Sequence, residues 1–522
     1  RPLRTSSRST NHSLSMFPGA AQLGEVVAIV QALLHAILVE GVTAAYARLI
    51  KSANLAIDDI HGKPDWLSKL KVVCVYYINV GSMVPATAPL PLAEEASPHV
   101  PGLMTTWREG ANKAATSLQP QGGVVVGTIR MGYGHHRIAY ATTSWALGMD
   151  KKTYFHDLLN LDSEEASLIK TMDHFYSQIS RIQAEFRAIE LVFGYLMANG
   201  ATANLARQFA VVSAHFRTLT AAFPRDTPII SCFPYVGLSA VAAGFTRVIN
   251  LVFDNHAQAF HIVPGAINLI QGPTMYHEFL QMGVDPKDLK IVGHWIPREL
   301  VVNIKSDCNA RKARAAARKP TRVLCSVGGA GAQKTFVCEL IRAMAERIAR
   351  GSAQLLLNAG DHTHMHEAFA NCLDDLGIRY TLVDTLQGVH DFCGRMSSGL
   401  EPERAVTIFA FNVYFPAVAT TDILCRVSDV LACKPGELAF YPVPKLMLRR
   451  VGDHEFYSAL RASEVGDGTQ ELREVSDVVR YLDIFAKSPD ALTQMNDSIL
   501  TNASVGMYDG CKAAVEMATA KL

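Results

Sequence analysis

Two glycine-containing turns constrain the fold of this chain most strongly. The first, at residues 132–136 (Gly-Tyr-Gly-His-His), follows the apolar run 122–128, and the second, at 328–331 (Gly-Gly-Ala-Gly), follows the apolar run 322–327. In each case a buried strand is expected to lead through small residues into a helix. Amides at the N-terminus of such a helix are unpaired and lie at the positive end of its dipole, so they favour anions or sugar hydroxyls. Two such units predict two Rossmann-like halves that face each other across a cleft.

Apolar runs alternate with helical segments on both sides of these turns, which predicts a parallel sheet in each half. The chain has 522 residues, a length that favours two or three domains. We expect a tail, a helical extension and a linker over residues 1–118, an N-terminal Rossmann-like acceptor domain over 119–305, a C-terminal Rossmann-like nucleotide-sugar domain over 320–460, and C-terminal helices over 461–522. The strands are expected at residues 123–129, 153–156, 228–232, 247–253 and 266–270, and then at 322–327, 354–358, 380–383, 406–410, 430–432 and 445–448.

Four segments outside these sheets have distinctive compositions. Residues 1–16 are rich in Ser, Thr and Arg and are expected to be disordered. Residues 26–42 are the most apolar stretch, but polar residues interrupt it, so we expect a packed helix rather than a membrane span. The proline-rich residues 84–105 are expected to form a linker or surface loop. The basic run 311–319 is expected to be a solvated connector between the domains.

Charge and cysteine content exclude several classes of function. The formal net charge is +1, so no overall field attracts nucleic acid or a bare anionic membrane. The ten cysteines show no CxxC pair or zinc-finger spacing, and several lie in apolar runs, as expected of buried thiols in a reducing, cytoplasmic compartment. His362, His364 and His366 have an i, i+2 spacing that a helix places on different faces, so no metal site is expected there.

Polar clusters follow six of the expected strands. They lie at residues 132–136, 254–256, 328–331, 360–362, 434–437 and 452–455. Ligands of open α/β sheets bind beyond the carboxyl ends of the strands, so these clusters predict one ligand site between the two sheets. Neither turn matches the dinucleotide fingerprint, because the third glycine is missing after Gly134, and no Gly-Lys-Ser/Thr follows Gly328, which excludes a P-loop.

Several of these motifs resemble those of one enzyme family. Residues 132–139 (Gly-Tyr-Gly-His-His-Arg-Ile-Ala) resemble the Gly-Gly-Gly-His-x-x-x-Ala segment of monogalactosyldiacylglycerol synthases, and are similar to the glycine/histidine loop of the bacterial glycosyltransferase that makes lipid II. Residues 279–298, 323–331 and 428–436 resemble further segments of that family in the same order. The resemblance covers about residues 120–460 and implies the GT-B fold, with two Rossmann-like domains and here an N-terminal helical extension.

The resemblance implies a metal-independent glycosyltransferase (a hexosyltransferase) that transfers a sugar from a UDP-sugar, its substrate rather than a cofactor, to a hydroxyl acceptor. Amides at Gly134, Gly328, Gly329 and Gly331 would face the donor. Lys434, Gly436 and Glu437 would hold the nucleotide and phosphates, and Asp453, His454 and Glu455 would face the sugar hydroxyls. The acceptor would enter beneath residues 132–136; a lipid acceptor would suit the family and would bring peripheral membrane contact. The sequence has no Asp-x-Asp motif, in agreement with a reaction that needs no metal.

One departure from the family concerns the donor pocket. Pro442 and Pro444 follow Glu437 closely, so the helix that carries a ribose-binding glutamate in the family must be shortened or absent. Either Glu437 takes over that role or the pocket is altered.

The expected reaction needs a base for the acceptor hydroxyl and groups that stabilise the leaving diphosphate. His135 or His136 is the leading candidate for the base, and Asp254 is the alternative base or the residue that orients it. Two other functions stay open: a nucleotide-sugar epimerase or hydrolase of the same fold, which would act without an acceptor, and a non-catalytic scaffold that has lost the donor site.

Overall fold

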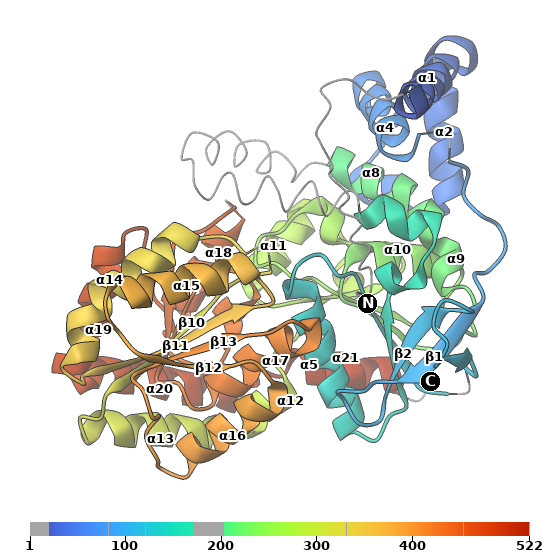
Figure 1. The fold of residues 1–522 in the computed structure, drawn as a ribbon. Helices are drawn as coiled ribbons and strands as arrows, with labels where there is room; N and C mark the ends of the chain where they lie inside the picture. The colour runs from blue at the N-terminus through green and yellow to red at the C-terminus, as the bar shows by residue number, and fades with distance from the viewer. Residues whose placement is uncertain are drawn as a thin grey trace, which may run out of the picture.

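The computed structural model describes residues 20–81, 83–120, 122–170, 203–329, 331–452 and 454–520; side chains are described from residue 27 onward. Two α/β domains lie side by side, and a unit of N-terminal helices extends from the far end of the first domain (Figure 1). Each domain is a sheet covered by helices on both faces. This arrangement confirms the expected fold of two Rossmann-like domains with a helical extension.

The first sheet contains nine strands among the described residues, in the order β3-β1-β2-β5-β4-β6-β7-β8-β9. The pairs from β2 to β9 are parallel, whereas β1 runs antiparallel to β2 and β3. The strands are β1 (Leu92–Ala96), β2 (Leu103–Arg108), β3 (Thr116–Ser117), β4 (Val124–Thr128), β5 (Thr153–Asp157), β6 (Ile229–Ser231), β7 (Val248–Leu251), β8 (Ile267–Ile270) and β9 (Leu289–Ile291).

The expectation of a linker over residues 84–105 is wrong, because β1 and the first half of β2 lie in this segment and extend the first sheet. The prolines do not interrupt the strands: Pro91 precedes β1, and Pro98 and Pro101 lie in the turn that joins β1 to β2. Proline cannot donate a ladder hydrogen bond, so its place outside the strands is compatible with a hairpin at the sheet edge.

The second sheet has six parallel strands among the described residues, in the order β12-β13-β11-β10-β14-β15. Its strands are β10 (Thr321–Ser326), β11 (Ala353–Gly360), β12 (Tyr380–Val383), β13 (Val406–Ala410), β14 (Val430–Cys433) and β15 (Lys445–Met447). All the strands expected in this half are present. In the second sheet β10 has β11 on one side and β14, much later in the chain, on the other, so the strand order reverses at β10, which is a topological switch point. In the first sheet β4 is the equivalent strand, because it lies between β5 and β6. The two glycine turns follow these two strands, where doubly wound sheets bind ligands.

The central strands β4 and β13 are buried on both faces, which is why each is a continuous apolar run. Along β4, Val125 points into one core, and Val124 and Val126 point into the core on the opposite face. The helices of the first domain are α5 (Gly134–Gly148), η2 (Leu158–Leu161), α8 (Ala203–Ser213), η4 (Ala214–Phe216), α9 (Arg217–Thr220), α10 (Pro234–Ala242), η5 (Ala259–His261), α11 (Pro273–Gln281), η6 (Pro286–Asp288) and α12 (Arg298–Val302). Those of the second part are α13 (Ile304–Ala316), α14 (Lys334–Ala349), α15 (Thr363–Asp375), α16 (Leu386–Ser397), α17 (Tyr414–Cys425), η7 (Glu437–Phe440), α18 (Glu455–Glu464), α19 (Val475–Lys487), α20 (Pro489–Ser504) and α21 (Gly510–Thr519).

The C-terminal helix α21 returns to the first domain. It packs against α5, β6 and β7, and its buried residues Cys511, Ala514 and Val515 belong to the same core cluster as Trp145 and Trp295. In Figure 1 α21 lies beside α5, far from α19 and α14 of the second domain. The first domain is therefore completed by residues from the other end of the chain.

The N-terminal helices are α1 (Ala20–Leu34), the π-helical η1 (His35–Gly41), α2 (Val42–Ala53), α3 (Ile57–His61) and α4 (Trp66–Val80). The helices α2 and α4 pack against α8 and thus attach this unit to the first domain. The helical stretch Val27–Ala53 is long and apolar enough to cross a membrane, judged by length and composition alone. Its mean hydropathy is 1.8, and 11% of its most apolar part is buried. The helix expected over residues 26–42 is present and packs against α4, but among residues 27–42 only Ala36 and Val42 are buried.

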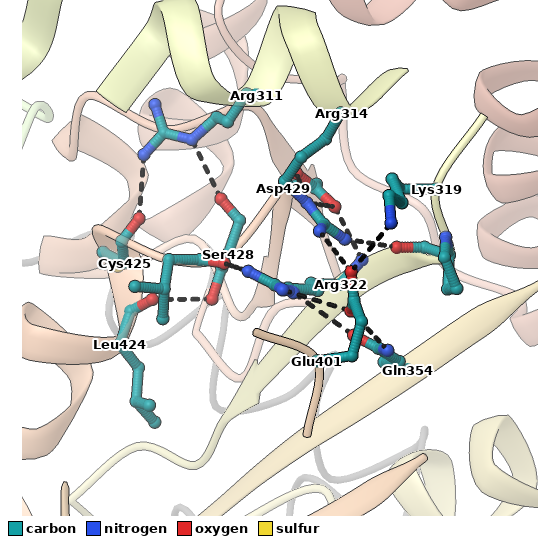
Figure 2. Close-up of polar contacts among 12 residues, drawn as sticks. Arg311, Arg314, Lys319, Arg322, Gln354, Glu401, Leu424, Cys425, Ser428 and Asp429 are labelled. Carbon is teal, nitrogen blue, oxygen red and sulfur yellow. Dashed lines mark hydrogen bonds and ion pairs between the residues drawn. The ribbon is translucent and has the colours of Figure 1, made fainter. Parts of the chain in front are cut away.

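The expectation that the basic run 311–319 is a solvated connector holds only in part, because Arg318 and Lys319 are exposed whereas Arg311 is buried. Figure 2 shows Arg311 and Arg314, both on α13, pointing into the second domain. The buried guanidinium of Arg311 donates to the carbonyls of Ser428 (2.9 Å) and Cys425 (2.8 Å). Arg314 pairs with Asp429 at 3.1 Å. Arginine carries five donors in a planar fork, so it can satisfy several buried carbonyls at once, and here it joins α13 to the end of α17.

Candidate functional site

The two glycine turns meet at the carboxyl ends of β4 and β10. A Cβ atom placed on Gly329 would lie 2.6 Å from Cα of Gly132, which is closer than real side chains allow. Gly132 also has a φ of +70°, a conformation that glycine adopts without strain. The backbones of the two domains therefore approach each other at a point where only glycine fits.

Side chains from both domains hold these turns in place. The hydroxyl of Tyr133, in the first turn, donates to the carboxylate of Asp361 and accepts from its amide at 3.0 Å. The Nε2 atoms of His362 and His364 lie 3.1 and 2.9 Å from the carbonyls of Gly328 and Gly331. Two of the histidines with apparent metal spacing thus position the second turn.

A cavity of about 270 Å³ lies beside the turns, between the two domains. One half is polar and is built largely from the second domain; the other half is apolar and comes from the first. The lining residues are Met131, Gly132, Tyr133, Gly134, His135, Ile138, Phe209, Phe233, Phe253, Asp254, Gln258, Phe260, Gly328, Gly329, Ala332, Lys434, Gly436, Glu437, Val451, His454 and Glu455.

Charged groups in the polar half are paired. Lys434 forms an ion pair with Glu455, whose other carboxylate oxygen accepts from the amide of Val451 at 2.7 Å. Burial opposes ionisation of Glu455, but Lys434 and His454 outweigh it and hold the pKa of Glu455 below its usual range. A ligand phosphate would therefore meet an ammonium group that already faces a carboxylate.

Glu437 forms an ion pair with Arg137 across the domain boundary. Arg137 comes from α5, is 1% exposed, and also donates to the hydroxyl of Thr421 at 3.1 Å. Burial would raise the pKa of Glu437, yet Arg137 and Lys434 hold it below its usual value. The first domain therefore contributes a cation to the donor side of the cavity.

His135 lies where the two halves meet. Its ring contacts Phe233 and Phe253 edge to face, with centroids 4.7 and 4.6 Å away. Burial lowers the pKa of His135 to about 4, so its imidazole is neutral at pH 7 and able to accept a proton. Its Nδ1 atom has no hydrogen-bond partner among the described residues.

Asp254 follows β7 on the first-domain side of the cavity. Burial raises the pKa of the Asp254 carboxyl. Its Oδ2 atom lies 3.8 Å from Nε2 of the fully buried His261, whose pKa burial lowers well below the usual value. A carboxylate backed by a neutral imidazole is a second candidate for proton transfer.

The structure separates the residues that the sequence places at the site. Those that line the cavity are His135, Asp254, Gly134, Gly328, Gly329, Lys434, Gly436, Glu437, His454 and Glu455. His136 does not: it points back into the first domain and lies 3.1 Å from the buried carboxylate of Asp157. Gly331 lies outside the lining, against His362 and His364. Asp453 lies outside the described residues.

The expected shortening after Glu437 is confirmed. Only the 3₁₀ turn η7 follows, and the chain then passes Pro442 and Pro444 into β15. Glu437 itself faces Arg137.

Several lining or supporting residues had no individual role assigned from the sequence. Tyr133, Asp361 and His362 lie within the polar clusters predicted at residues 132–136 and 360–362. The residues outside those clusters, which were not predicted, are Arg137, Phe209, Phe233, Phe253, Gln258, Phe260 and His364. In the part of the chain that the structure describes, no group of three or more His, Cys, Asp or Glu could hold a metal ion.

Comparison with known proteins gives family matches and weak structural likeness. Residues 91–281 match the family model described as domain of unknown function DUF6937, and residues 284–519 match DUF6938. No curated protein matches the chain.

Similar solved structures include HepE from Anabaena in complex with UDP, which is 11% identical, has a TM-score of 0.36, and covers 75% of this chain and 97% of that one. MnaA from S. aureus with UDP is 12% identical, with a TM-score of 0.39 and coverage of 72% and 91%. Trehalose-6-phosphate synthase from Burkholderia multivorans is 10% identical, with a TM-score of 0.33 and coverage of 60% and 76%. From residue 91 onward the chain thus matches two domain families in tandem, and the second match begins within the first structural domain.

Proposed function

We propose that this protein is a glycosyltransferase that moves a sugar from a nucleotide-diphosphate sugar, a UDP-sugar in the first instance, to a hydroxyl acceptor. The observation that carries the proposal is the single cavity in which both glycine turns, Lys434, Glu437 and His135 meet. Glycine amides and a lysine suit a diphosphate, carboxylates suit sugar hydroxyls, and a neutral histidine suits proton removal.

The proposed reaction follows from these positions. The acceptor oxygen forms a bond to the anomeric carbon while its proton passes to His135 or Asp254. The bond from the anomeric carbon to the diphosphate breaks, and its electron pair leaves with the nucleoside diphosphate. Lys434 and the amides of Gly328 and Gly329 stabilise the charge that develops on the leaving group.

A panel of nucleotide sugars tested by thermal unfolding checks this proposal. A true donor at about 100 times its dissociation constant should add about 2.7 kcal/mol of stability. Lys434→Met should weaken donor binding by about tenfold or more, because a charge-assisted contact to phosphate is lost. Lys287→Met is the matched control, since Lys287 is exposed on the first domain and pairs only with Asp285 among the described residues. If no nucleotide sugar shifts the transition, the chain is a scaffold without a donor site.

One observation favours a second function, nucleotide-sugar epimerisation or hydrolysis. Three carboxylates, Asp254, Glu437 and Glu455, line the cavity beside one lysine, which is more acid–base capacity than transfer requires. Release of free sugar or of an epimer from the donor without acceptor would identify that reaction.

We further propose peripheral membrane contact through the N-terminal helices, at the cytoplasmic surface. Val27, Val30, Leu34 and Leu38 recur at helical spacing along α1 and η1 and are 47–75% exposed. A helix that is apolar on its exposed face as well as on its packed face suits a lipid surface. Residues 1–24 carry three arginines and no acidic residue, which complements anionic lipid. All ten cysteines are free thiols, as suits the cytoplasm.

Sedimentation with anionic vesicles tests this contact. The wild-type protein should sediment with the vesicles, and a Leu34→Asp/Leu38→Asp double variant should remain in solution, because two charges would enter the lipid interface. Val505→Asp, at an apolar position 72% exposed on the other domain, is the control and should behave as the wild type. Equal sedimentation of all three proteins would exclude these helices as the contact.

A further inference from the structure

The apolar half of the cavity is built from aromatic rings. Phe209 comes from α8, Phe233 from the start of α10, Phe253 from the loop after β7, and Phe260 from η5. Phe209 and Phe260 have centroids 4.6 Å apart, and Phe233 and Phe253 stack at 5.8 Å. Rings from four separate segments thus surround one small space next to His135.

We infer that this half of the cavity binds a flat, uncharged ring that carries the acceptor hydroxyl, as in a phenol or an aryl alcohol. The inference rests on the proposed function for the transfer step, but ring binding itself needs no donor. Aromatic walls favour a planar ring, which they contact by stacking or edge to face.

A single amide supplies the polar contact in this half. Gln258 is 3% exposed, and its side chain lines the cavity without a hydrogen-bond partner among the described residues. An amide at the wall of the cavity can donate to, or accept from, a polar group on the bound molecule. Asp254 lies at the border with the polar half, and no lysine or arginine lines the apolar half, which favours an uncharged ring.

The size of the cavity limits the ligand. An apolar cavity of about 150 Å³ holds a benzene molecule. The cavity of about 270 Å³ therefore has room for about one or two fused rings beside part of a sugar. Because His135 contacts Phe233 and Phe253, a hydroxyl on a ring stacked there would lie beside the imidazole, facing Lys434 and Glu455.

Binding of 2-naphthol and of its saturated counterpart 2-decahydronaphthol, measured on the full chain without donor, tests the inference directly. We expect 2-naphthol to bind about tenfold more tightly, because aromatic contacts are worth more than area burial alone. Phe209→Leu and Phe253→Leu, made separately, should each weaken 2-naphthol binding by about threefold to tenfold. The control Phe392→Leu removes a half-buried phenylalanine of the second domain and should change nothing.

The outcomes separate this inference from the proposed function. Equal affinity for the aromatic and saturated compounds, no binding of either, or unchanged binding in both variants would overturn the ring site even if a nucleotide sugar binds. Binding of 2-naphthol without any nucleotide-sugar binding would keep the ring site and overturn the transferase. With a donor present, formation of a naphthyl glycoside is the expected product. The rate of glycoside formation can then be compared for the same ring free in solution and attached to a lipid in vesicles. The faster of the two shows whether the acceptor is soluble or membrane-borne.

Discussion

Replacing His135 by alanine is expected to lower kcat by about a hundredfold to a thousandfold, the usual contribution of a general base, while donor binding stays within about twofold of the wild type. The reason is geometric: His135 lies between the aromatic half and the polar half of the cavity, and its neutral imidazole can take a proton. Turnover by product formation and donor affinity by calorimetry provide the two measurements. His136→Asn is the matched control, because His136 faces Asp157 inside the first domain and not the cavity.

The pH dependence gives an independent check on this base. The pKa of His135 is lowered to about 4 by burial, so the imidazole stays unprotonated, and competent as a base, at every pH above that value. The acid limb of kcat/KM should therefore fall near pH 4, whereas an ordinary histidine would lose activity near its usual pKa of about 6.5. If His135→Ala keeps full turnover while Asp254→Asn abolishes it, Asp254 is the base.

The second large effect concerns the ion pair between Arg137 and Glu437, which joins the domains. Arg137→Met should lower the free energy of unfolding by about 3 kcal/mol, because it leaves the carboxylate of Glu437, only 16% exposed, without its main partner. Adding Glu437→Gln should recover part of that loss, because the uncompensated charge disappears. Urea unfolding followed by fluorescence measures both variants.

A surface pair of the same chemistry is the control for this prediction. Arg395 and Glu403 lie 2.8 Å apart, with their side chains 48% and 67% exposed. Arg395→Met should cost less than about 1 kcal/mol, because solvent screens the pair. If Arg137→Met unfolds at the same urea concentration as the wild type, the two domains are held together by other contacts.

Local sequence was sufficient to predict the second sheet and the centre of the first, whereas β1, β2, β3 and β9 were not predicted. The expected strands at 380–383 and 406–410 match β12 and β13 residue for residue. The strand β13 is buried and is therefore a continuous apolar run that can be recognised without its partners. The glycine turns were predictable for the same reason, since a strand, small residues and a helix follow one another along the chain.

Contacts between distant segments were not predictable in this way. Arg137 and Glu437 are 300 positions apart in the sequence. The residues around each of them give no sign that the other will neutralise its charge. The basic run at α13 was expected to be solvated because runs of charged residues usually are. Arg311 instead donates hydrogen bonds to buried carbonyls of the second domain. The phenylalanines of the cavity come from four elements whose common neighbourhood exists only after the sheet has formed.

The return of α21 to the first domain has a consequence for how this protein can be divided. The boundary between the two family matches lies between residues 281 and 284, yet β9 and α21, which complete the first sheet and its core, both belong to the second match. A fragment ending at that boundary would lose its edge strand and expose Trp145 to water. The first matched region is therefore not an autonomous folding unit, and we expect it to fold only with the second region, in one polypeptide or as co-expressed halves that reassemble.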